Sequence, residues 1–143
     1  MQRPSKVMLI GLDGVPLGII RRWALQGHLP TFQRLMDSGV FGPLRSTVPP
    51  TSGPSWSSFV TGMNPGKTGI YDFLYRRDGT YAFSPVNASL RSGTSIWHYL
   101  SEAGYQVGVL NIPVSYPVER VNGFMVSGWM TPYTAHDYTY PPE

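Results

Sequence analysis

The stretch KVMLIGLDG, residues 6–14, is an apolar run that closes on an acid and a glycine. Uninterrupted runs of this kind are typical of strands buried on both faces of a parallel sheet. We therefore predict a buried strand over Lys6–Leu12, with its carboxyl end at Asp13. Open α/β sheets bind their ligands at that edge, so the Asp13 carboxylate is a candidate metal ligand. The alternative, that Asp13 caps the next helix, is equally consistent with its position.

Helical and strand-like segments alternate along the rest of the chain. Proline and glycine positions and apolar spacing predict helices over 16–27, 29–39, 54–63 and 94–104. Apolar runs predict strands over 105–113 and 123–129 and a weaker one over 40–47. Alternating aromatics around RRDGT predict a hairpin over 71–85, and 131–143 reads as a loop. This order predicts an α/β fold with a largely parallel sheet flanked by helices.

The composition excludes several classes of protein. The 143 residues are 41% hydrophobic, which suits one modest domain with a real core. The net charge of +3 comes from scattered basic residues, so we predict no nucleic-acid binding. The chain has no cysteine, which excludes disulfides and thiolate metal sites. No secretory leader or membrane-spanning segment is evident, so we expect a cytoplasmic protein with no membrane partner.

Two adjacent hydroxyls, Thr51 and Ser52, precede the helix predicted from Pro54. The first amides of a helix and its dipole attract phosphate to this position. A serine becomes a nucleophile only beside a base or a metal ion. A Ser-His-Asp triad would need His28, His98 or His136, none of which has an evident partner, and the G-x-S-x-G elbow is absent. A metal held by Asp13 is the other route, and a plain N-cap role for Ser52 is the competing interpretation.

The segment PGKTG, residues 65–69, does not satisfy the pattern of a phosphate-binding loop. Three residues separate Gly62 from Gly66 where that pattern has four, and a predicted helix precedes it instead of a strand. We therefore interpret Gly62, Pro65 and Gly66 as a turn that ends a helix.

Several motifs in order carry a family resemblance. VMLIGLDG, followed by LPTFQRLMDSGVFGPLRSTVPPTSGPSWSSFVTGMNPGKTGIYDF, resembles the N-terminal part of the alkaline phosphatase superfamily. The most similar branch is the type I phosphodiesterase / nucleotide pyrophosphatase group, and VGVLNIPVSYP and GWMTP…YTYPPE match it more loosely. The resemblance implies an alkaline-phosphatase-like fold, with residues 1–143 forming the N-terminal, truncated part of one catalytic domain.

The resemblance also implies roles for individual residues. Asp13 would ligate one of two divalent metal ions, commonly zinc. The nucleophile lies eight residues before the Val of VTG, which is Val60, so it would be Ser52, with Thr51 as the adjacent alternative. Ser52 would also contact the metals and form a covalent phospho-enzyme. Two cations about 4 Å apart would lower the pKa of the hydroxyl and neutralise the transferring phosphoryl group.

The sequence departs from this group at two positions. Relatives often read NPGKHGI, with an asparagine three residues later that holds the phosphate; this chain has Thr68 and Phe73 there. Gly53 and Phe73 are still expected to contact substrate. We therefore expect a phosphodiesterase or a related phosphohydrolase acting on a small phosphate ester, not a strict dinucleotide pyrophosphatase.

The family's remaining metal-ligand patterns, D-x-x-x-H and D-H-G, are absent. His136-Asp137 fits neither and is interpreted as polar loop. Because zinc takes about four ligands, we expect the others beyond Glu143, with the C-terminal remainder of the domain as partner. The isolated chain is expected to bind zinc weakly and to turn over little or no substrate.

Two alternative functions stay open. The first is a sulfatase-like or phosphomutase-like member of the same superfamily, although Trp56 stands where the sulfatase pattern C/S-x-P-x-R has arginine. The second is a non-catalytic interaction domain that works through the aromatic hairpin over 71–85.

Overall fold

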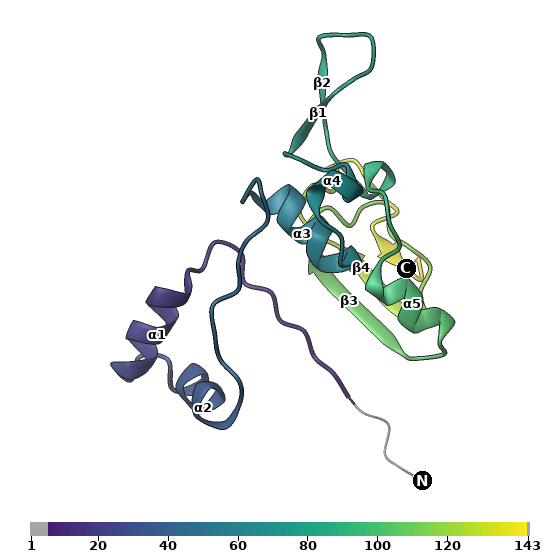
Figure 1. Ribbon diagram of the computed structural model, residues 1–143. Coiled ribbons are helices and arrows are strands. Elements are labelled where there is room, and N and C mark those ends of the chain that lie inside the picture. Colours follow the sequence, from purple (N-terminus) through teal and green to yellow (C-terminus); the bar gives the residue numbers. More distant parts are fainter. Residues whose placement is uncertain (1–5, 143) are drawn as a thin grey trace. The chain divides into compact units, whose positions relative to one another are not determined.

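The computed structural model describes residues 6–142. The chain forms two compact units, and the boundary along the sequence falls between Arg45 and Ser46. The first unit holds α1 (Leu17–Leu25) and α2 (Pro30–Ser38), which pack against each other (Figure 1). Both confirm predicted helices. Pro16 and Pro30 stand at their beginnings and Gly39 at the end of α2, as helix termini prefer.

The predicted strand over Lys6–Leu12 is wrong. This segment is irregular, and its apolar side chains are exposed, with Val7 at 81%, Met8 at 82% and Ile10 at 76%. A strand needs a neighbouring strand to take up its backbone hydrogen bonds. Within the described part of the first unit, residues 6–45, there is no other strand. The apolar run alone therefore does not produce one.

The predicted strand over residues 40–47 is also wrong. The segment is irregular, and Val40, Phe41 and Leu44 are exposed. Pro43 lies within it and lacks the amide that a ladder requires, which weakens any strand at this place.

The second unit begins its helical part with α3 (Ser52–Thr61), which starts two residues before the predicted boundary. Gly62 ends α3 in the left-handed conformation, as its role in a helix-ending turn requires. Pro65 and Gly66, however, belong to a further short helix, α4 (Pro65–Thr68), capped by the Asn64 side chain through the Lys67 amide. The interpretation of Gly62, Pro65 and Gly66 as a helix-ending turn is therefore correct for Gly62 and wrong for Pro65 and Gly66, which are helical.

The second unit holds a mixed three-stranded sheet and an antiparallel hairpin. The strands β3 (Val107–Ile112) and β4 (Gly123–Ser127) pair in parallel, as their apolar runs predict, and β5 (Thr139–Tyr140) pairs antiparallel with β4. The predicted hairpin is confirmed as β1 (Leu74–Arg76) and β2 (Phe83–Pro85), which extend away from the rest of the unit (Figure 1). The α/β class therefore holds, but a largely parallel sheet is not confirmed. The segment over 131–143, predicted as loop, contributes β5.

The core of the second unit lies between the helices and the sheet. Its main cluster takes Val60 from α3, Trp97 from α5 (Ile96–Glu102), and Val109 and Met125 from the paired strands. The cap of α5 is the Ser95 hydroxyl, which accepts the His98 amide. Within residues 6–142, the helices are all too short or too polar to cross a bilayer.

Candidate active site

The beginning of α3 lies at the carboxyl edge of the parallel strand pair. Val60, near the end of α3, packs with the mid-strand residues Val109 and Met125. At the other end, Gly53 abuts Phe73, whose ring contacts Trp129, two residues past the end of β4. The helix therefore runs antiparallel to the strands, and its first turn lies where open α/β sheets bind ligands.

Thr51 and Ser52 occupy that first turn. Thr51 is the N-cap, with extended backbone, and Ser52 is the first helical residue, so the interpretation of Ser52 as the N-cap is wrong. The Thr51 side chain makes no capping hydrogen bond, and its buried hydroxyl has no hydrogen-bond partner among the described residues. The first intrahelical bond runs from the Ser55 amide to the Thr51 carbonyl at 3.0 Å, so the Ser52 and Gly53 amides precede it.

Thr47 braces the loop that leads into α3. Its hydroxyl donates to the Pro49 carbonyl at 2.9 Å and lies 2.8 Å from the Ser55 hydroxyl. Because the Thr47 proton is used on Pro49, the Ser55 hydroxyl donates to Thr47. The result is a chain of hydroxyls that ties the approach segment to the first turn of the helix.

Gly53 allows a second segment to approach the first turn closely. A Cβ at this position would lie 3.0 Å from the Asp72 carbonyl oxygen and 3.7 Å from the Phe73 ring. The Asp72 carboxylate accepts the Phe73 amide at 2.7 Å, and the Phe73 ring meets Trp129 edge to face with centroids 4.9 Å apart. The structure therefore places Phe73 next to Gly53, the residue that follows Ser52, and the role of Phe73 in binding substrate stays a prediction.

The last residues of β3 and the connection that follows it have unusual backbone geometry. Asn111 and Val114 adopt left-handed φ angles of 56° and 57°, and Met130, just after β4, has φ 79°. Asn111 is the extra residue of a bulge, since Leu110 pairs with Val126 and Ile112 with Ser127. Left-handed non-glycine residues cost energy and gather at functional sites.

The buried side chain of Arg91 holds this connection through a hydrogen bond. Its side chain is 3% exposed, donates to the Val114 carbonyl at 3.0 Å and pairs with Glu119 at 3.2 Å. The Ser95 hydroxyl holds the other oxygen of the same carboxylate at 2.6 Å. Burial lowers the pKa of Arg91 from its ordinary value, and the negative charge of Glu119 opposes that shift. The Val114 amide in turn donates to the Trp129 carbonyl, so this network links the connection after β3 to the segment after β4.

Asp13 lies in the first unit, in a turn with Gly14 at φ 66°, whereas Ser52 lies in the second. The N-cap of α1 is Pro16, so the alternative of Asp13 as a helix cap is wrong. The convergence of Asp13 and Ser52 on one cation stays a prediction. Across residues 6–142, no group of three or more His, Asp or Glu side chains could hold a metal ion.

In the second unit, His98 and the neighbour of His136 make contacts with residues other than Thr51 and Ser52. His98 Nε2 pairs with Glu102 Oε1 at 3.3 Å, one turn along α5. Asp137, next to His136, accepts the hydroxyl of Tyr116 at 2.8 Å. Both contacts are those of polar surface residues.

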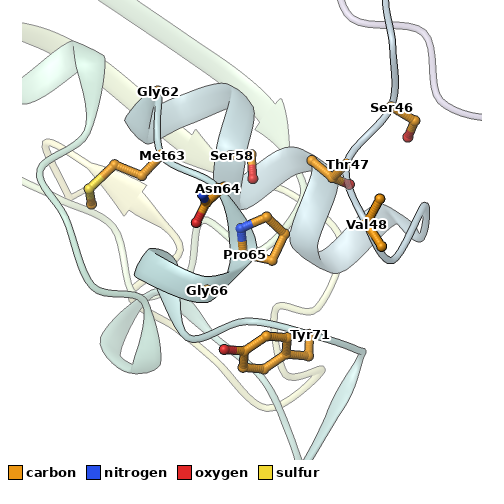
Figure 2. A pocket seen from close by; sticks show the side chains of 10 residues that line it. All are labelled: Ser46, Thr47, Val48, Ser58, Gly62, Met63, Asn64, Pro65, Gly66 and Tyr71. Atoms are coloured by element: carbon orange, nitrogen blue, oxygen red, sulfur yellow. The ribbon is translucent and has the colours of Figure 1, made fainter.

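An open pocket of ≈ 740 Å³ lies beside α3, but the predicted site residues do not line it. Figure 2 shows that its lining comes from the second half of α3, the α3–α4 connection, the beginning of α4, Tyr71 and the loop at 46–48. Ser58 and Tyr71 supply hydroxyls there, and no charged side chain lines it. The pocket therefore does not coincide with the first turn of α3.

Sequence reasoning named Ser52, Gly53 and Phe73, which the structure brings together, and missed Thr47 and Trp129. Neither of the missed residues carries a local signal, because each acts through a contact with a residue distant in sequence. Asn111 had a usable signal: asparagine tolerates the left-handed conformation better than most residues, and here it ends an apolar strand.

Comparison with known proteins identifies the family of the chain. The family model for type I phosphodiesterase / nucleotide pyrophosphatase matches residues 7–142. The chain therefore belongs to that family, a group of hydrolases that act on phosphodiesters and pyrophosphates. No curated protein and no solved structure matches the chain.

Proposed function

We propose that the protein is a metal-dependent hydrolase of small phosphate esters that works through a covalent phosphoserine at Ser52. The observation that carries the proposal is the position of Ser52 in the first turn of α3, at the carboxyl edge of the β3–β4 pair. The family match supports the hydrolase class.

The reaction would proceed in two displacements at phosphorus. The Ser52 oxygen attacks the phosphorus atom, a new O–P bond forms, and the bond to the leaving alcohol breaks, so that the alcohol departs with a proton. Water then attacks the phosphoserine, releases phosphate or a phosphomonoester, and returns the proton to Ser52. The Ser52 and Gly53 amides, which precede the first intrahelical bond of α3, would donate to the phosphoryl oxygens.

Divalent cations, zinc by the resemblance, would lower the hydroxyl pKa and offset phosphoryl charge when bound. Asp13 and Ser52 offer oxygen donors, which divalent metals accept, so these residues fit as part of such a site. They are two donors where zinc takes about four. We propose that further ligands complete the site; among residues 6–142, no group of three or more His, Asp or Glu side chains is found.

Thr51 is the matched control for Ser52, because it has the same chemistry one residue earlier. In the protein as its gene encodes it, supplied with Zn²⁺ and bis-p-nitrophenyl phosphate, Ser52→Ala should lower kcat about a thousandfold or more. Thr51→Ala should lower it less than about tenfold. If Thr51→Ala abolishes hydrolysis and Ser52→Ala spares it, the nucleophile is Thr51. Equal rates for both variants and the wild type would end the proposal.

The metal assignment needs a separate readout. Titration calorimetry with Zn²⁺ should show weaker binding for Asp13→Asn than for the wild type, with Asp37→Asn, on the exposed face of α2, as control. Unchanged zinc affinity in Asp13→Asn removes Asp13 from the site. Faster turnover of p-nitrophenyl sulfate than of the phosphodiester would favour the sulfatase-like alternative.

A further inference from the structure

Asn111 presents an amide that the fold itself does not use. The residue is exposed, and its side chain has no hydrogen-bond partner among the described residues. Its backbone is left-handed, with φ 56°, and it is the unpaired residue of the β3 bulge. Bulges of this kind re-aim a side chain at the end of a strand, often beside an active site.

Close backbone contact fixes where Asn111 lies. A Cβ at position 128 would lie 2.5 Å from the Asn111 carbonyl carbon, so only glycine fits at that position opposite the bulge. Trp129 follows Gly128 directly, and its ring contacts Phe73, which abuts Gly53. Asn111 therefore lies at the same edge of the sheet as the first turn of α3.

The backbone alone does not explain the residue type. Glycine adopts a left-handed conformation without cost, whereas asparagine only tolerates it. What asparagine adds is a neutral amide with two N–H donors. At this edge Phe73 and Trp129 supply no donor to an oxyanion beyond the indole N–H, so an amide donor is a distinct contribution.

We propose that the Asn111 amide donates a hydrogen bond to a non-bridging oxygen of the phosphoryl group bound at Ser52, and so helps to select tetrahedral phosphate. This inference rests on the proposed function and adds a substrate-contacting residue to it. A donor on β3 would add to the amides of α3, because the two groups belong to different elements.

Asn111→Gly is the deciding variant, because it keeps the left-handed backbone and removes only the amide. Its melting temperature should equal or exceed that of the wild type, since glycine relieves the conformational cost. Its affinity for inorganic phosphate, measured by calorimetry in the zinc-loaded protein, should fall about tenfold to a hundredfold, as for hydrogen bonds to charged groups. Asn111→Asp should bind phosphate more weakly still, because it replaces a donor with a negative charge.

Asn87→Gly serves as the control, because it removes an amide that caps a short turn and should leave phosphate affinity unchanged. Wild-type phosphate affinity in Asn111→Gly or in Asn111→Asp overturns the inference. If hydrolysis still depends on Ser52 in that case, the proposed function stands without it. If the wild-type protein binds no phosphate and Ser52→Ala changes nothing, both fail together.

Discussion

Gly53 and Asp72 are in direct backbone contact, since a Cβ on Gly53 would lie 3.0 Å from the Asp72 carbonyl oxygen and 3.3 Å from its carbonyl carbon. Neither atom belongs to a flexible side chain, so neither can move aside cheaply. The contact sets the distance between the first turn of α3 and the segment that carries Phe73.

Gly53→Ala should therefore destabilise the second unit by about 1–3 kcal/mol, the usual cost of forcing a methyl group into a packed site. It should also lower phosphodiester hydrolysis, because α3 must shift away from Phe73. Gly18→Ala is the control: nothing lies within 4 Å of its Cβ, and alanine in a helix should stabilise by up to about 1 kcal/mol. Urea denaturation measures both, and equal stability of the two variants would contradict the contact.

The Thr47 hydroxyl should matter for the position of the Thr51–Ser52 pair. Thr47→Val keeps the shape but removes the hydrogen bonds to Pro49 and Ser55, which should cost about 1–2 kcal/mol and lower kcat more than it changes KM. Thr47→Ser retains the hydroxyl and should restore both stability and kcat. Failure of serine to rescue would assign the effect to the lost methyl packing instead.

The buried ion pair of Arg91 and Glu119 should carry more stability than a surface pair. Glu119→Gln leaves the Arg91 charge buried without its counter-charge, at a cost of about 1–3 kcal/mol. Glu102→Gln breaks the exposed pair with His98 and should change stability by less than about 0.5 kcal/mol. Thermal or urea unfolding distinguishes them, and similar costs for both variants would contradict the burial argument.

We predict that the Tyr116 phenol makes the stability of the fold depend on pH in the alkaline range. Its hydrogen bond to the Asp137 carboxylate is the main reason that the Tyr116 pKa is raised above 10.0, with burial and the charge of Asp137 adding to it. A raised pKa means that the folded state favours the neutral phenol. The stabilisation is therefore complete below pH 10.0, the ordinary value, and is lost as pH rises through the folded pKa.

Carbon-13 NMR titration of Tyr116 checks this directly. Asp137→Ala should bring the pKa of Tyr116 back toward its ordinary value, while Asp78→Ala, in the hairpin turn, should leave it raised. A titration of Tyr116 that is indifferent to Asp137 would show that the hydrogen bond does not form in solution.

The sequence predicts the parts of the fold that local chemistry determines. Prolines at helix starts and glycines at helix ends located α1, α2 and α3 to within two or three residues, and the Asp78-Gly79 turn located the hairpin. The apolar runs located β3 and β4, because these strands have each other as partners.

What failed depends on residues far apart in the chain. The run over Lys6–Leu12 has the composition of a strand. Pairing, however, needs two segments, and the described part of its unit, residues 6–45, contains no second strand. The two residues of β5 have too little pattern to be seen alone. In the candidate site, Ser52 and Phe73 were predicted, whereas the contact between Phe73 and Trp129 joins segments more than fifty residues apart.

The bare apolar run at residues 7–12 has a practical consequence at the bench. An extended, exposed apolar segment readily pairs with the open sheet edges of neighbouring molecules. Preparations at high concentration should therefore form oligomers, and calorimetry on such samples would report dissociation heats along with phosphate binding. A dilution series followed by light scattering, run before any titration, identifies the concentrations at which the protein is monomeric. At those concentrations the measured heat comes from phosphate binding alone.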